Sequence, residues 1–379
     1  MPPLSLLIKP ASSLCNLRCR YCFYHDLSSS RAVASYGLMT DDVLDQVLAR
    51  AFEQADDSLT LAFQGGEPTL CGLDFYRRLV EKVDRLNPRR LPVHYALQTN
   101  GQVIDADWAR FLAERHFLVG LSVDGPAVLH DTLRVDAKNI GSHKRALQAA
   151  ALFAAHGTEF NILTVVSDLL ARHPDKVYRF FAQKGYTYLQ FIPCLAPLGS
   201  DPKDDPHAVR PERYATFLMR LFDLWFDDIS QGKPISIRLF DNDVRMLAGE
   251  APEQCGLGGL CTCQLVIEAD GSVYPCDFYV TDDWRLGHVR EHSFAQLLRS
   301  ERAQRFVALS RPVPACCQSC RFYPLCRNGC RRDREQPEGD EPGVNRFCAA
   351  YRQFFEHAYP RLEWLARRWR AMQSGGTHR

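Results

Sequence analysis

Short apolar runs alternate with amphipathic stretches along the first half of the chain. The apolar runs have the length of buried strands and lie at residues 4–8, 59–63, 93–97, 117–123, 160–166 and 188–192. The stretches between them carry apolar side chains at helical spacing and lie at residues 41–55, 73–86, 106–115, 142–156 and 174–184. Because strands that alternate with helices form parallel sheets, the pattern predicts an α/β fold whose sheet is open or rolled into a partial barrel.

Polar and glycine-rich residues follow the predicted strands. Cys15 follows the first strand, and Gly-Gly-Glu-Pro at 65–68 follows the second. Gln-Thr-Asn-Gly at 98–101 follows the third, and Ser122 and Asp124 close the fourth. Since ligands of parallel α/β folds bind at the carboxyl ends of the strands, we expect these residues on one rim.

The second half of the chain has a different composition. A linker rich in Pro and Asp at 197–210 leads to a predicted helix at 211–230 and a predicted short strand at 235–240. Ten of the fifteen cysteines lie between residues 255 and 348, and a last helix is expected at 349–372. We therefore expect two domains, at residues 1–234 and 235–379.

Charge and hydropathy narrow the class of protein. The formal net charge of +1 gives no electrostatic case for binding nucleic acid or an anionic membrane surface. No apolar run is long enough to span a membrane, and the N-terminus lacks the basic region of a signal peptide. A long chain with many cysteines and no export signal indicates metal ligation in the reducing cytoplasm, not a disulfide scaffold.

The N-terminal cysteines Cys15, Cys19 and Cys22 have the spacing C-x3-C-x2-C. Three thiolates on a four-iron cluster leave one iron open, whereas the alternative, a zinc loop, usually has paired arms that supply four ligands. The run resembles the signature of the radical S-adenosylmethionine (SAM) enzymes. The resemblance implies that the open iron binds SAM, whose reductive cleavage supplies a 5′-deoxyadenosyl radical.

The C-terminal cysteines resemble the SPASM extension of radical SAM enzymes. The resemblance implies a partial (β/α)6 TIM-type barrel followed by a cysteine-rich SPASM domain and a terminal helix, with three four-iron clusters in all. Two auxiliary clusters would be ligated by Cys255, Cys261, Cys276 and Cys330, and by Cys317, Cys320, Cys326 and Cys348. Cys263 or Cys316 could replace a neighbouring ligand, and a zinc ribbon is the alternative for the whole block.

Family positions for SAM also have counterparts in this chain. The resemblance implies that the segment Gly65, Gly66 and Glu67 binds the amino group of SAM. The remaining contacts that it implies are Ser122 and Arg134 to the ribose and carboxylate, Tyr21 beside the adenine, and the backbone of Leu195.

Asp277 follows Cys276 in the run Asp-Gly-Ser-Val-Tyr-Pro-Cys-Asp-Phe at 270–278. This run is similar to the anaerobic sulfatase-maturating enzymes, which oxidise a cysteine or serine of a sulfatase to Cα-formylglycine. The resemblance implies that Asp277 is the general base and that Gln64 contacts the substrate peptide. It also implies a sulfatase polypeptide as partner and a flavodoxin or ferredoxin as electron donor, and we expect a monomer.

Two other functions remain open at this point. One is a radical SAM/SPASM enzyme that installs thioether or carbon–carbon crosslinks in a precursor peptide. Only 14 residues precede Cys15, which disfavours a fused recognition domain of the kind many such enzymes carry. The other is a non-catalytic iron–sulfur electron-transfer protein, which predicts no cleavage of SAM.

Overall fold

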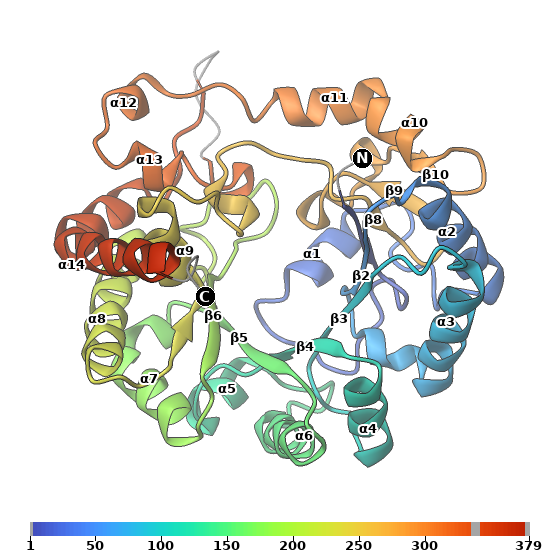
Figure 1. Cartoon of the computed structure of the whole chain (residues 1–379), viewed down its shortest axis with the longest axis horizontal. Helices are drawn as coiled ribbons and strands as arrows, with labels where there is room; N and C mark the ends of the chain where they lie inside the picture. Colours follow the sequence, from blue (N-terminus) through green and yellow to red (C-terminus); the bar gives the residue numbers. More distant parts are fainter. Residues whose placement is uncertain (1–2, 335–341, 376–379) are drawn as a thin grey trace.

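Six parallel strands form the centre of the computed structural model, which describes residues 3–334 and 342–375. They are β1 (Leu4–Ile8), β2 (Leu59–Phe63), β3 (Val93–Thr99), β4 (Phe117–Ser122), β5 (Phe160–Val166) and β6 (Tyr188–Pro193). Each strand pairs in parallel with the next, and together they curve into an arc (Figure 1). The predicted partial barrel is therefore confirmed.

Four short strands extend the sheet at its two edges. β7 (Ser236–Ile237) pairs in parallel with β6. At the other edge β8 (Val266–Ile267) pairs in parallel with β1, and β9 (Ser272–Tyr274) and β10 (Gly287–His288) continue it in antiparallel fashion. The cysteine-rich half of the chain thus hydrogen-bonds directly to the first strand of the barrel.

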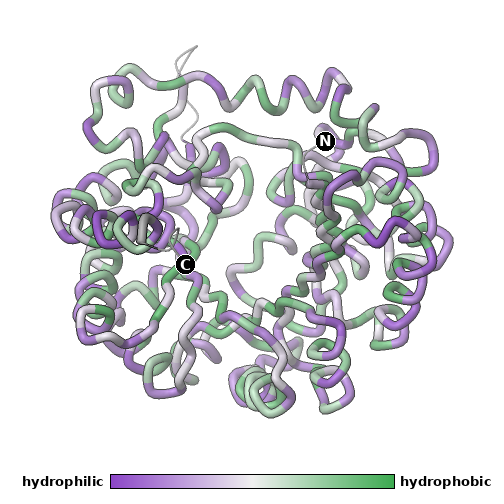
Figure 2. The backbone as a smooth tube through the Cα atoms, in the orientation of Figure 1, coloured by the Kyte–Doolittle hydropathy of each residue, from purple (hydrophilic) through white to green (hydrophobic). Residues whose placement is uncertain are grey.

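Helices cover the outer side of the arc, and hydrophilic stretches recur along α2 and α3 (Figures 1 and 2). They are α2 (Asp41–Gln54), α3 (Leu73–Leu86), α4 (Ala106–Glu114), α6 (His143–His156), α7 (Pro174–Gln183) and α8 (Pro211–Ser230). α2 begins as predicted, because the Thr40 side chain accepts a hydrogen bond from the Val43 amide at 3.3 Å. Two shorter helices, α1 (Phe23–Ser29) and α5 (Ala127–Leu133), follow β1 and β4.

The prediction of a strand at 235–240 is wrong except at residues 236 and 237. After the two residues of β7 the chain forms α9 (Arg238–Leu247). Phe240, Val244 and Leu247 recur at helical spacing, and the Phe240 ring packs on those of Phe222 and Phe354. Burial of this aromatic cluster therefore favours a helix where the local β propensity indicated a strand.

Five further helices complete the described part of the C-terminal half. They are α10 (Phe294–Arg299), α11 (Glu301–Ala308), α12 (Ala315–Gln318), α13 (Tyr323–Cys326) and α14 (Cys348–Gly375). α14 confirms the predicted last helix and packs against α8 and α9. Among the residues that the structure describes, none of the helices is long and apolar enough to cross a membrane.

Candidate active site

A cavity of about 590 Å³ lies at the carboxyl ends of the strands. Its wall brings together residues that are far apart in the sequence and that the sequence analysis named as candidate site residues. They are Cys15, Cys19, Tyr21, Cys22, Gln64, Gly65, Gly66, Glu67, Ser122, Arg134 and Leu195. The wall also includes Cys255, Cys261, Cys276, Cys326 and Cys330 from the C-terminal half.

The loop that carries Cys15 packs on the glycine turn after β2. The Glu67 amide donates a hydrogen bond to the Leu14 carbonyl at 2.7 Å. Gly66 has φ +53°, and a Cβ atom there would lie 2.3 Å from the Leu14 oxygen. Glycine is thus required for the close approach of the two loops.

The N-terminal thiols lie in a mostly buried environment with amide donors nearby. The Leu17 amide lies 3.4 Å and the Asn100 side-chain amide 3.7 Å from Cys15 Sγ. Burial raises the pKa of Cys15 to about 12 and that of Cys19 to about 11. The free thiols of Cys15 and Cys19 are therefore protonated at neutral pH, and iron binding has to release these two protons.

Arg134 is held in the cavity wall by Asp124. Arg134 Nε lies 2.8 Å from Asp124 Oδ2, and the Tyr21 hydroxyl donates to the same oxygen. Burial disfavours the guanidinium charge, but Asp124, together with Tyr21 and Cys19, more than offsets this, and the pKa of Arg134 lies well above its usual value. A fixed cation at this wall suits a ligand carboxylate, because a guanidinium can bind a carboxylate with two hydrogen bonds.

Glu67 and Ser122 hold the rim together. The Glu67 carboxylate accepts hydrogen bonds from the Thr69 hydroxyl at 2.6 Å, the Thr99 hydroxyl at 2.7 Å and the Asn100 amide at 2.7 Å. Ser122 Oγ accepts a bond from the Gln98 side chain at 3.2 Å. The Glu67 side chain therefore joins the ends of β2 and β3, a role that sequence reasoning did not predict.

Asp277 lies behind the cavity wall and is 5% exposed. Its Oδ2 accepts hydrogen bonds from the Tyr24 hydroxyl at 2.5 Å and from Gln64 Nε2 at 3.1 Å, and both donors line the cavity. Gln64 Nε2 also lies 2.7 Å from the Tyr24 hydroxyl. Burial raises the pKa of Asp277, and the ammonium of Lys9 opposes this rise. Tyr24 was missed in the sequence, although its position two residues after Cys22 is a signal for it.

Four C-terminal thiols form one electrostatic group. The pKa of Cys330 is raised to about 12, mainly by burial and then by the negative charges of Asp333, Cys261 and Cys255. Burial and the neighbouring Cys330 and Cys255 likewise hold the pKa of Cys276 well above its usual value. These four cysteines are those predicted to ligate one auxiliary cluster.

Cys263 interacts electrostatically with Cys261 but lines a different cavity from that group. Its thiol lies 3.8 Å from the Ala303 carbonyl, and it lines a second cavity that shares no cysteine with the first. This placement supports Cys261, not Cys263, as the member of the group.

A second group of thiols surrounds Cys326. Burial, with contributions from Cys348 and Cys320, raises the pKa of Cys326 to about 11. Burial and then Cys316, Cys348 and Cys326 raise the pKa of Cys317 to about 12. The group contains the four cysteines predicted for the other auxiliary cluster, and the exposed Cys316 lies beside it.

The thiol groups are more widely spread than the ligands of one ion. Within residues 3–334 and 342–375, no three Cys, His, Asp or Glu side chains converge as the ligands of a single metal ion do. A four-iron cluster takes each thiolate on a different iron, so its ligands lie farther apart. The donor set and its grouping therefore fit iron–sulfur clusters.

Comparisons with known proteins show the family of this chain. The profile described as "Radical SAM superfamily" matches residues 10–181, and the one described as "Iron-sulfur cluster-binding domain" matches residues 260–321. The cysteine-type anaerobic sulfatase-maturating enzyme of Clostridium perfringens strain 13 is 46% identical over 362 residues, which are 96% of this chain and 98% of the relative. The chain belongs to the anaerobic sulfatase-maturating enzymes of the radical SAM superfamily.

Other members of the family and solved structures are also similar to this chain. The serine-type anaerobic sulfatase-maturating enzyme of Bacteroides thetaiotaomicron is 29% identical, covering 96% of this chain and 91% of the relative. The structure of native anSMEcpe with bound AdoMet and Cp18Cys peptide has a TM-score of 0.93 and 44% identity, covering 97% of this chain and 99% of that chain. SuiB of Streptococcus suis, with a TM-score of 0.62 and 17% identity over 92% of this chain and 76% of that chain, shares the fold alone.

The family membership supports the cofactor class. Radical SAM and SPASM domains imply four-iron clusters and SAM. The number of clusters and the residues that contact SAM stay predictions.

Proposed function

We propose that this protein oxidises a cysteine or serine of a sulfatase polypeptide to Cα-formylglycine under anaerobic conditions. One observation carries the proposal. Tyr24 and Gln64 line the same cavity as Cys15, Cys19 and Cys22, and behind them lies a buried carboxylate, Asp277, to which both donate hydrogen bonds. A cofactor that abstracts a hydrogen atom from the target carbon and a base for the thiol or hydroxyl on that carbon would therefore meet at one cavity. The relatives named above support this activity.

The cavity wall offers residues for the cofactor. Cys15, Cys19 and Cys22 would hold the first cluster, which together with SAM supplies a 5′-deoxyadenosyl radical that removes a hydrogen atom from the target Cβ. The contacts that we propose for SAM are Gly65, Gly66 and Glu67, Ser122, Arg134, Tyr21 and the Leu195 backbone.

Asp277 would act as the general base. It accepts the proton of the target thiol or hydroxyl, and loss of this proton makes the neighbouring carbon radical a stronger reductant. Gln64 and Tyr24, which touch both the cavity and Asp277, would orient the substrate side chain and the carboxylate together. A serine then yields the aldehyde directly, while a cysteine yields a thioaldehyde that water hydrolyses.

The eight grouped C-terminal cysteines would hold two further four-iron clusters, which gives three in all. Clusters whose irons are all ligated by protein carry electrons and do not bind substrate. Clusters held there would supply an acceptor for the electron that the target releases. We place the boundary between the barrel with its linker helix and the auxiliary-cluster domain near residue 235.

We infer that cysteine is the preferred target. The cysteine-type relative is 46% identical to this chain and the serine-type relative 29%. We further propose a flavodoxin or ferredoxin as electron donor, a monomeric enzyme and a cytoplasmic setting, which suits exposed thiols and oxygen-sensitive clusters.

The test is to incubate the reduced holoenzyme with SAM and a sulfatase-derived peptide that carries cysteine, serine or alanine at the target position. We expect the cysteine peptide to yield both 5′-deoxyadenosine and a peptide aldehyde, and the alanine peptide to yield no aldehyde. The aldehyde is trapped with a hydrazide and identified by mass. A crosslinked product that retains sulfur would reject the proposal in favour of a crosslinking enzyme. Absence of 5′-deoxyadenosine would reject radical SAM chemistry altogether.

A further inference from the structure

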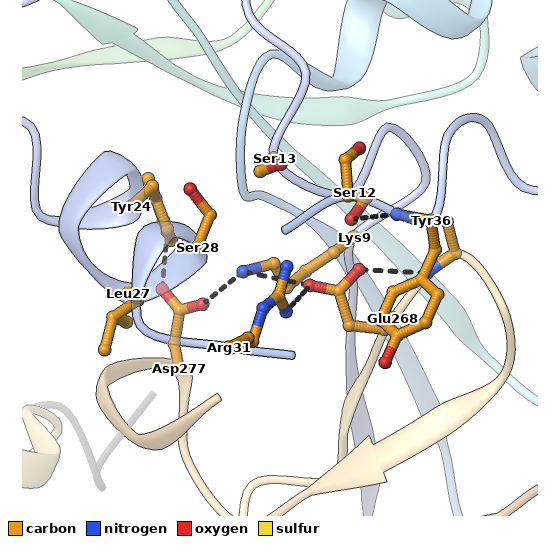
Figure 3. Close-up of polar contacts among 12 residues, drawn as sticks. Lys9, Ser12, Ser13, Tyr24, Leu27, Ser28, Arg31, Tyr36, Glu268 and Asp277 are labelled. Carbon is orange, nitrogen blue, oxygen red and sulfur yellow. Dashed lines mark hydrogen bonds and ion pairs between the residues drawn. The ribbon is translucent and has the colours of Figure 1, made fainter. Parts of the chain in front are cut away.

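Four buried charged side chains form a chain of ion pairs that ends at Asp277 (Figure 3). Arg31 Nη1 lies 2.7 Å from Glu268 Oε1, Lys9 Nζ lies 3.6 Å from the same oxygen, and Lys9 Nζ lies 3.8 Å from Asp277 Oδ1. The exposed fractions of these four side chains are 2%, 0%, 4% and 7% from Arg31 to Asp277. The charges alternate in sign, so each buried ion faces an opposite one, as burial of charge requires.

The sheet brings the two central charges together. β1 and β8 are parallel neighbours in which Ile8 lies opposite Ile267. The Lys9 amide donates to the Ile267 carbonyl at 2.8 Å, so Lys9 and Glu268 leave the two strands side by side at the rim. Pairing of the barrel with the cysteine-rich half therefore creates the contact.

The Lys9 side chain is closely packed along its length. Gly65 has φ +95°, and a Cβ atom there would lie 2.6 Å from Lys9 Cε and 2.9 Å from Lys9 Cγ. The ammonium lies 4.7 Å from the centre of the Tyr24 ring. Lys9 is thus confined between the glycine turn and the tyrosine that hydrogen-bonds to Asp277.

The two oxygens of Asp277 have different surroundings. Oδ2 accepts hydrogen bonds from Tyr24 and Gln64 on the cavity wall. Oδ1 is buried and accepts no hydrogen bond from any residue that the structure describes, and the ammonium of Lys9 faces it. An ammonium on one side and two donors on the other oppose rotation of the carboxylate.

We propose that Lys9 is a positioning residue for Asp277 and that Glu268 and Arg31 hold Lys9 in place. The chain keeps Oδ2 directed toward the cavity, where the target proton is removed. Lys9 itself does not line the cavity, and its ammonium faces the Oδ1 side of Asp277, not the Oδ2 side that Tyr24 and Gln64 contact. This inference rests on the proposed role of Asp277 as the base.

The test is Lys9→Met in the full holoenzyme, which keeps an unbranched side chain against Gly65 but removes the charge. Arg31 still pairs with Glu268, so that buried anion stays compensated, and the change falls on Asp277, which loses the ammonium that faces Oδ1. We expect 5′-deoxyadenosine formation to change by less than about twofold, while aldehyde formed per 5′-deoxyadenosine falls about 10- to 100-fold, the loss typical of a misplaced catalytic group. The KM for peptide should stay unchanged while kcat for aldehyde falls.

Lys82→Met is the matched control, because Lys82 pairs with Asp45 far from the cavity wall and is 15% exposed. It should leave the ratio of aldehyde to 5′-deoxyadenosine unchanged. If Lys9→Met fails to retain iron, Arg31→Met tests the same chain, and we expect a smaller fall in the ratio.

Three outcomes separate the two proposals. A wild-type enzyme that makes no aldehyde rejects the proposed function. The positioning role is overturned if the wild-type enzyme makes aldehyde and Lys9→Met keeps the wild-type ratio of aldehyde to 5′-deoxyadenosine. The same holds for Arg31→Met where it replaces Lys9→Met. Loss of both 5′-deoxyadenosine and aldehyde at full iron content also overturns it, since Lys9 would then serve the SAM site.

Discussion

Replacing Asp277 by asparagine separates proton removal from the cleavage of SAM. The substitution keeps the shape of the side chain but removes the negative charge that Tyr24 and Gln64 contact. Asp277 does not line the cavity, so the SAM pocket should be unchanged. We therefore expect 5′-deoxyadenosine to form at nearly the wild-type rate while the aldehyde does not.

The magnitude follows from the role of the carboxylate. A positioned general base contributes about 10²- to 10⁴-fold, which corresponds to about 3–5 kcal/mol in the barrier to aldehyde formation. The cost in folding should be smaller, at about 1–3 kcal/mol for a disturbed buried hydrogen bond. Lys9 keeps Glu268 as a partner at 3.6 Å, so the variant leaves no isolated buried cation.

The assay counts 5′-deoxyadenosine by chromatography and hydrazide-trapped aldehyde by mass in the same reaction. Asp270→Asn is the control, because Asp270 lies in the turn between β8 and β9, just before Asp277 in the sequence, but its carboxylate accepts a hydrogen bond from the Ser272 hydroxyl at 2.7 Å and does not contact the cavity side chains. That variant should keep the wild-type ratio. Aldehyde from Asp277→Asn at the wild-type rate would show that Asp277 is not the base.

Further predictions concern packing, acid stability and iron content. Gly65→Ala places a Cβ atom 2.6 Å from Lys9 Cε, and we expect a loss of about 1–3 kcal/mol in urea unfolding, together with a lower yield of aldehyde per 5′-deoxyadenosine. Burial alone would raise the pKa of Glu268, but Lys9 and Arg31 lower it below its usual value. The stability that this carboxylate contributes is therefore present above about pH 4.3 and is lost as pH falls through the pKa of the folded state. In urea titrations over that acid range, Glu268→Gln should lose less free energy of unfolding than the wild type. Cys261→Ser should lower the iron content by about one cluster and Cys263→Ser should not; the reverse result would exchange their assignments.

Much of the barrel could be predicted because its signals are local. The spacing of apolar residues within each segment locates β1, β2, β5 and α3 to the residue, and Thr40 marks the start of α2. The strand predicted at 235–240 failed because Phe240 is buried by rings of α8 and α14, which the local sequence does not reveal.

The positions of the cysteines and the run around Asp277 were sufficient to predict the family, because a cluster motif is defined by residue type and spacing along the chain. The partners of Asp277 were not predictable in this way. Tyr24 and Asp277 are 253 residues apart, and Arg31 and Glu268 are 237 apart. A charge in the sequence is by default a solvated surface residue, and only the pairing of β8 with β1 buries Lys9 and Glu268 side by side. The sequence by itself therefore determined the cofactor chemistry and the barrel, whereas the tertiary structure decided the surroundings of the base, because long-range strand pairing sets which distant charges share a buried environment.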